Sequence, residues 1–134
     1  MIIIGAIALC VIAHLILGMI WYSPMLFGNT WAQQTYKLSS TAKKDEINIV
    51  YGLSALAAFI MAVVLQYVMA EVEIQQISEA LLLGSMLWLG FTFTTSLVNS
   101  LYQGKSKKLV FIDSGYYLLS SCAMSIIIFL LMYP

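Results

Sequence analysis

The sequence contains few charged residues and no arginine. Charged residues make up 9% of its 134 residues and hydrophobic residues 62%, and the mean hydropathy is +0.95. A soluble domain of this length could not bury so much apolar surface. The lysines form no cluster larger than three, and apolar runs flank every cluster, which is not the pattern of a nucleic-acid-binding surface. We therefore expect a protein that resides in a lipid bilayer and has no nucleic-acid partner.

Cysteine, histidine and proline are also scarce, with two, one and two residues respectively. Cys10 and Cys122 fall near the middle of apolar segments, so no disulfide framework is indicated. Cys10 and His14 are one helical turn apart and could offer two ligands to a soft metal or one axial ligand to haem. No further ligand stands at a matching spacing, so packing is the favoured role of this pair. The sequence predicts no metal site and no cofactor.

Four long apolar segments cover most of the chain. They run over residues 2–22, 47–70, 80–100 and 109–133. A helix rises about 1.5 Å per residue, so about 20 residues cross a hydrocarbon core of about 30 Å, and no proline interrupts any segment. The short connections favour neighbouring helices that run in opposite directions. The sequence thus predicts an all-α membrane protein, one domain over residues 1–134, folded as a four-transmembrane-helix antiparallel up-down bundle.

The first segment is interpreted as a retained span. It has no basic region before the apolar run and no small-residue cleavage pattern after it, unlike a secretory signal peptide. Ser23 and Pro24 then suit the start of a helix, and Trp31, Thr35 and Leu38 recur at helical spacing. We expect a short interfacial helix after the first span.

The lysines predict the orientation, because positively charged connections resist translocation and stay in the cytoplasm. All six lysines lie in the first and third connections, whereas the second carries Glu71, Glu73 and Glu79 but no lysine. Both termini should therefore lie outside the cytoplasm, in a multi-pass protein of the cell (inner) membrane.

Several polar side chains fall within the apolar segments, where each needs a partner or a wet cavity. They recur at helical spacing and define one face on each segment. The faces are Ala6, Cys10, His14 and Gly18 on the first segment, Gly84, Trp88, Thr92, Thr95 and Asn99 on the third, and Asp113, Tyr117, Ser121 and Ser125 on the fourth. Helical rise puts most of the polar side chains in the cytoplasmic half of the bilayer. The candidate polar cavity or ion path consists of His14, Thr92, Thr95, Asn99, Asp113 and Tyr117. Asn99 and Asp113 fall at the same depth, about 12 Å from the middle of their spans, which predicts a hydrogen bond between them.

Simpler interpretations of these residues remain open. Asp113 lies near the start of a helix, where the helix dipole and nearby lysines favour an acid. His14 could be a neutral side chain hydrogen-bonded within the bundle. Serine and threonine hydroxyls in membrane helices often bond to their own backbone or to a neighbouring helix. The spacing of these residues alone does not distinguish such structural roles from a role in an ion path.

Three stretches of the chain resemble one family. The stretch GMIWYSPMLFGNTW, from Gly18 to Trp31, resembles the signature of a bacterial membrane family catalogued as domain of unknown function 1761. The runs LWLGF at 87–91, YQGK at 102–105 and IDSGY at 112–116 resemble its second half. The resemblance covers nearly the whole chain and implies four spans in a bacterial membrane. It implies no activity and no catalytic residue.

The first of these stretches also has a direct physical interpretation. Trp21, Tyr22 and Trp31 are aromatic residues of the kind that anchor a helix at the membrane–water interface. Ser23 and Pro24 are residues that turn the chain. Their default role is structural, and a gate over the cytoplasmic mouth is the functional alternative.

Two classes of function remain. The first is a small transporter or channel with a polar cavity open to the cytoplasm. The alternative is an accessory or scaffold protein that packs against a membrane-protein partner within the bilayer. We do not expect an enzyme, because the sequence offers one histidine, no paired intramembrane carboxylates and no nucleophile with a base at evident spacing. Four helices enclose few side chains, so a conducting path predicts a homo-oligomer.

Overall fold

The computed structural model of the protein describes residues 1–34 and 44–134, and the side chains of α4 from residue 48 onward. These residues form helices joined by turns, with no strand among them. The elements in chain order are α1 (Ile2–Trp21), α2 (Gly28–Gln34), α4 (Lys44–Glu71), α5 (Ile77–Leu87), η1 (Trp88–Phe93), α6 (Thr94–Tyr102) and α7 (Lys107–Met132).

Four helical segments are long and apolar enough to cross a membrane, which confirms the predicted all-α class and the four spans. They are Ile2–Trp21, Asn48–Glu71, Ile77–Tyr102 and Lys107–Met132. The third begins three residues before the predicted start at residue 80, because a capping box starts the helix there. The Glu79 carboxylate accepts hydrogen bonds from the main-chain N–H groups of Gln75 (2.8 Å) and Gln76 (3.2 Å).

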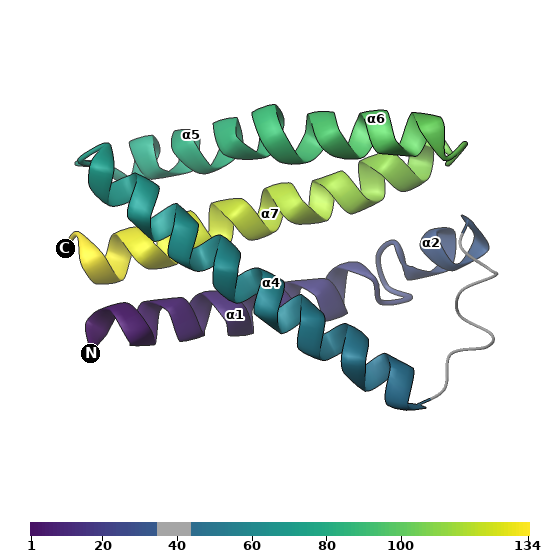
Figure 1. The fold of residues 1–134 in the computed structure, drawn as a ribbon, viewed down its shortest axis with the longest axis horizontal. Helices are drawn as coiled ribbons and strands as arrows, with labels where there is room; N and C mark the ends of the chain where they lie inside the picture. The colour runs from purple at the N-terminus through teal and green to yellow at the C-terminus, as the bar shows by residue number, and fades with distance from the viewer. Residues whose placement is uncertain (35–43) are drawn as a thin grey trace.

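The helices alternate in direction, and both termini lie at the same end of the molecule (Figure 1). α7 lies between α1 on one side and the continuous helix α5–η1–α6 on the other, and it packs against both. α4 crosses α1 and α7 obliquely and contacts both (Figure 1). The antiparallel up-down order is as predicted, with the second span tilted across the other three.

A short helix follows the first span, also as predicted. α2 covers Gly28–Gln34 and includes Trp31, which is half-buried. Thr35 and Leu38, which were expected to continue this helix, lie outside the described residues, as do Lys37 and Lys43.

Small side chains fill the crossing of α4 with α1. Cys10 of α1 and Ala58 and Ala62 of α4 are fully buried in one cluster with Met124 and Ile128 of α7. In a bilayer, helices gain little from hydrophobic burial and associate chiefly through close van der Waals contact, which small residues permit. The oblique crossing depends on this contact.

α5 and α7 are in close contact at Gly84. The Ser121 hydroxyl of α7 donates a hydrogen bond to the Gly84 carbonyl oxygen (2.9 Å). A Cβ atom at Gly84 would collide with the Ser125 Oγ atom and would lie 3.2 Å from the Ser121 Oγ atom. Gly84 therefore sets the distance between the third and fourth spans.

The third span contains one π-helical segment, η1. A π-helix holds an extra residue in its turn, so the helix after it faces its neighbours with a different set of positions. Ala80 and Gly84 are buried before η1, whereas Ser100 is the buried residue of α6 and Asn99 beside it is exposed.

The contact at Gly84 leads to a stability prediction. We expect Gly84→Ala to lower the free energy of unfolding by about 1–3 kcal/mol, because the added methyl group overpacks the α5–α7 contact. Ser125→Ala removes the colliding oxygen, so the double variant should recover part of the loss. Thermal unfolding in detergent measures both effects.

Gly52→Ala is the matched control for this prediction. Gly52 lies in α4 with open space around the position of a Cβ atom, so this variant should be at least as stable as the wild type. Equal stability of the Gly84→Ala and Gly52→Ala variants would contradict close packing at Gly84.

Candidate functional site

Several polar side chains line the interface where α1 packs antiparallel to α7, which we call the α1–α7 seam. Ala6, Cys10 and His14 of α1 are buried, which confirms the inward face predicted for the first span. Facing residues advance by one turn on each helix. The facing pairs are Cys10 with Met124, His14 with Ser120, and Gly18 with Tyr116.

His14 is enclosed by side chains of α7. Its Nδ1 atom lies 2.6 Å from the Ser120 Oγ atom, in a hydrogen bond whose donor depends on the imidazole tautomer. The Tyr116 hydroxyl donates to the His14 main-chain oxygen (2.8 Å). The imidazole ring also lies beside the rings of Tyr116 and Tyr117, with centroids 5.1 and 6.2 Å away. The imidazole is therefore held in one orientation near the middle of the first span.

Asp113 lies at the other end of the seam, and its partner is Tyr22. The Tyr22 hydroxyl donates to the Asp113 Oδ1 atom over 2.7 Å, and the carboxylate is half-buried. The Tyr22 ring meets the rings of Tyr116 and Trp31 edge-on, with centroids 5.4 and 5.5 Å apart. The predicted hydrogen bond between Asn99 and Asp113 is wrong, because Asn99 points outward from α6.

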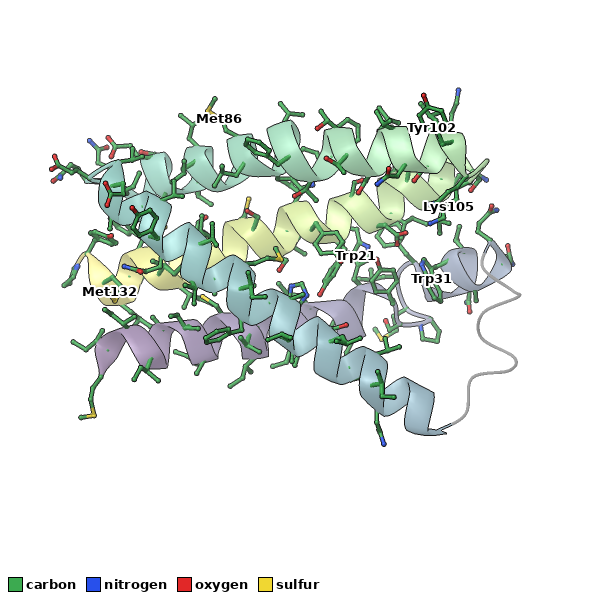
Figure 2. All side chains as sticks on the ribbon, in the orientation of Figure 1. Trp21, Trp31, Met86, Tyr102, Lys105 and Met132 are labelled. Atoms are coloured by element: carbon green, nitrogen blue, oxygen red, sulfur yellow. The ribbon has the colours of Figure 1, made fainter. Side chains whose placement is uncertain are left out.

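Trp21 fixes the end of α1 on α7. Its indole N–H donates to the Ile112 carbonyl oxygen (2.9 Å). Its ring covers Gly115, where a Cβ atom would lie only 3.1 Å from the indole, and it stacks at a tilt on Phe27 with centroids 4.6 Å apart. Figure 2 shows Trp21 at the end of α1 and Trp31 on α2 beside it.

The turn after Trp21 is closed by Ser23. Its hydroxyl donates to the Ile20 carbonyl oxygen (2.7 Å), and its own carbonyl oxygen accepts the Gly28 N–H (2.9 Å). Pro24 is exposed at the outside of the turn. A Cβ atom at Gly28 would collide with the Tyr22 carbonyl oxygen, so the turn requires glycine there. The predicted anchor and turn residues thus form one folded unit that also supplies the partner of Asp113.

Trp88 binds α7 from the opposite side. Its indole N–H donates to the Ser114 carbonyl oxygen (2.7 Å), two residues from the carbonyl that Trp21 uses. Two tryptophans, one from the first span and one from η1, therefore hold α7 at the same level. The Ser114 hydroxyl itself is buried there and has no hydrogen-bond partner among the described residues.

The remaining predicted path residues lie apart from the seam. Thr92 is half-buried, whereas Thr95 and Asn99 are exposed. Thr95 and Asn99, together with Thr94 and Val98, line a shallow, open hollow of about 330 Å³ on the outside of α6. The expectation of one polar ladder for all six residues is therefore corrected: His14, Tyr117 and Asp113 gather at the seam, and Thr95 and Asn99 face outward.

The π-helix explains this division. The predicted stripe through Gly84, Trp88, Thr92, Thr95 and Asn99 assumed an uninterrupted α-helix. The extra residue of η1 turns α6 by about 100°, one residue of a helical wheel. The inward positions therefore fall one residue later than in an uninterrupted α-helix, and Ser100 is buried where Asn99 was expected.

Sequence reasoning also missed Tyr116 and Ser120, and it assigned Tyr22 only an anchoring role. The predicted face of α7 followed strict steps of four residues from Asp113. A helix face also includes steps of three: Tyr116 lies three residues after Asp113, and Ser120 lies four residues after Tyr116. Helical spacing is compatible with both the face that contains Tyr117 and the face that contains Tyr116 and Ser120. Choosing between these two faces requires the position of α1.

The side chains along the seam are ones that can donate or accept protons. Imidazole, phenol, hydroxyl and carboxylate groups follow one another along it, and each can donate or accept a proton. No group of three or more histidine, cysteine, aspartate or glutamate side chains that could hold a metal ion occurs within residues 1–34 and 48–134. The Cys10 thiol donates weakly to the Met124 carbonyl oxygen (3.8 Å), and both cysteines are free thiols.

The contact between Tyr22 and Asp113 leads to a second prediction. Tyr22→Phe should lower the free energy of unfolding by about 1–3 kcal/mol, because the part-buried carboxylate loses its donor. In Tyr22→Phe with Asp113→Leu, neither partner remains, so the double variant should lose less than the sum of the single variants. Detergent unfolding of the three variants gives the coupling free energy.

Tyr51→Phe is the control, because Tyr51 is exposed on α4 and should tolerate the same chemical change. Additive losses in the Tyr22 and Asp113 variants would contradict the pairing.

Comparison with known proteins gives one match. Neither the search of curated proteins nor the search of solved structures found a similar protein. A family model described as "Protein of unknown function (DUF1761)" matches residues 5–129. This range includes the folded unit at Trp21–Gly28, the π-helix and almost all of α7. The chain therefore belongs to the DUF1761 family of proteins of unknown function.

Proposed function

We propose that the protein is a small membrane transporter or channel that moves protons, alone or coupled to a solute, along the α1–α7 seam. The observation that carries this proposal is the row of proton-exchanging groups from Asp113 and Tyr22 to His14 and Ser120. Ionisable side chains are costly within a bilayer and usually mark a path for ions or protons. His14 is also the side chain whose ordinary pKa lies closest to physiological pH.

The proposed path begins at Asp113. Its half-buried carboxylate, close to the lysine-containing start of α7, would receive a proton or attract a cation from the aqueous phase. Tyr116 lies between the two ends, with its ring against Tyr22 and its hydroxyl on the His14 main chain. A proton would pass from Asp113 to His14 by way of these hydroxyl groups and transient water. Two rigid indole contacts to α7 would keep the geometry of the entrance constant.

The proposal includes an orientation with both termini outside the cytoplasm of a cell (inner) membrane, and a homo-oligomer. Lys105, Lys107 and Lys108 cluster at the start of α7, at the same end of the molecule as Asp113. Glu71, Glu73 and Glu79 cluster at the opposite end, in and around the connection of α4 to α5. The positive end would face the cytoplasm, so the path would open there. Subunit contacts would complete a path that four helices enclose only in part.

Cysteine labelling in cells tests this orientation. In a background with Cys10→Ala and Cys122→Ala, a cysteine replacing exposed Gln75 should react with an impermeant thiol reagent added outside. A cysteine replacing exposed Gln103 should react only after the membrane is permeabilised. The opposite pattern would reverse the proposed orientation and put Asp113 at the outer surface.

Proton flux tests the function. Protein reconstituted in liposomes containing a pH-sensitive dye should acidify or alkalinise the lumen when a potassium gradient with valinomycin imposes a potential. Asp113→Asn and His14→Gln should each lower the rate by about tenfold or more, the size expected when a positioned proton-transfer group is lost. Tyr22→Phe should lower it less, because the carboxylate remains.

Glu71→Gln is the matched control, since it makes the same carboxylate-to-amide change at an exposed position on α4. It should leave the flux unchanged. Wild-type protein with no flux above that of empty liposomes, under potentials of either sign and from pH 5 to 8, would overturn the transport proposal. That result would favour the accessory role, in which the protein packs against another membrane protein.

A further inference from the structure

The third span is compatible with two registers. In the structure, η1 places its extra residue between Trp88 and Phe93, and the helix after it turns Ser100 inward. An uninterrupted α-helix continued from Gly84 would instead bring inward the residue that precedes each of the present inward positions. Asn99 would take the place of Ser100, and Thr95 the place of Ser96.

The side chains suit both registers. The present inward positions after η1 carry small or apolar residues, among them Ser96, Leu97 and Ser100, which are half-buried or buried. The alternative inward positions carry Thr95 and Asn99, which now leave polar groups on the lipid-facing side, where hydrogen-bond partners are scarce. In either register, a small or polar residue meets α7 at the level of Ser100, so neither arrangement forces a large side chain into the contact at that level.

Identifiable contacts hold the present register. The Thr94 hydroxyl donates to the Gly90 carbonyl oxygen (2.7 Å), which gives that carbonyl a donor within the irregular segment. Phe93 packs its ring against Trp88 and Phe111, with centroids 5.3 and 6.4 Å apart. An uninterrupted helix would replace Phe93 by Thr92 at this position and would lose these ring contacts.

Two features near the third span are relevant to a change of register, one on α7 and one in the connection that follows α6. The Ser114 hydroxyl of α7 is buried without a partner at the level where Trp88 binds. Beyond α6, an α register would extend the span by about 1.5 Å, the rise of one residue. The connection there contains Gly104 at a φ of +65° with open space around it. Glycine can change its backbone angles more readily than other residues, so this connection can take up the extra length.

We infer that η1 is a register switch: closing the π-helix into an α-helix turns α6 and exchanges Asn99 for Ser100 on the side facing α7. The switch turns Thr95 and Asn99, which are now exposed, toward α7. It would thereby restore the inward stripe that an uninterrupted α-helix predicts for the third span. The inference concerns the conformation of the third span and is independent of whether protons pass along the α1–α7 seam.

Thiol reactivity tests the switch in the reconstituted full-length protein. In the Cys10→Ala and Cys122→Ala background, single cysteines replace Val98, Asn99 or Ser100, and a membrane-permeant maleimide is added. Position 98 is exposed in both registers and serves as the control. Position 99 is exposed only in the π register, and position 100 only in the α register.

Deletion of Gly90 should remove the extra residue and lock α6 in its present orientation. We expect this deletion to lower the reactivity of the cysteine at position 100 by about tenfold or more, because it eliminates a minor state populated at about 0.1–10%. The reactivities at positions 98 and 99 should not change. Unchanged reactivity at position 100 would overturn the switch.

A second variant keeps the full chain length, in case the deletion prevents folding. Gly90→Ala raises the α-helical propensity at a position with open space for a Cβ atom, and Thr94→Val removes the hydroxyl bond to the Gly90 carbonyl. Together they should raise the reactivity at position 100 and lower it at position 99, relative to position 98. Reactivity that rises equally at positions 99 and 100 would indicate local unfolding and would overturn the inference.

Discussion

The structure depends on the requirement that polar groups within the spans find partners in the protein rather than in lipid. α7 meets this requirement for two other spans. It supplies carbonyl oxygens to the indole groups of Trp21 and Trp88, and its hydroxyls bind the main chains of α1 and α5. These bonds, together with the contact at Gly84, hold α1 and the α5–η1 segment at fixed positions against α7. Hydrogen bonds of this kind contribute modestly one by one, but they determine which faces meet.

Most of the fold could be predicted from the sequence because bilayer thickness sets the length of a span. Apolar segments of the required length appear in the sequence without ambiguity, and their ends were correct to within a few residues. Hydropathy carries no information on crossing angles, so the oblique path of α4 was not predicted. The small side chains of Ala58 and Ala62 are buried where α4 crosses α1, and their size permits the close approach of the two helices.

The candidate site was predicted only in part. The inward face of α1 followed from helical spacing, because α1 is a regular helix. On the third span the same reasoning assigned the wrong inward-facing residues after Trp88, because no residue type predicts a π-helix. For Asp113 the sequence indicated Asn99 at the same depth, or the nearby lysines, as partners. The choice of Tyr22 depends on the turn at Ser23, which directs the chain back onto α7.

The hydrogen bond from Tyr22 to Asp113 joins residues 91 positions apart. The first span and its turn are therefore made long before the helix that completes their contacts. At translation rates of about 5–20 residues per second, this delay is roughly 5–20 s. During that interval the indole of Trp21 and the phenol of Tyr22 lack their hydrogen-bond acceptors on α7. Both rings are amphipathic and are therefore suited to lie at the membrane–water interface until α7 is made. The contacts between this early motif and α7 can therefore form only after the fourth span has been made.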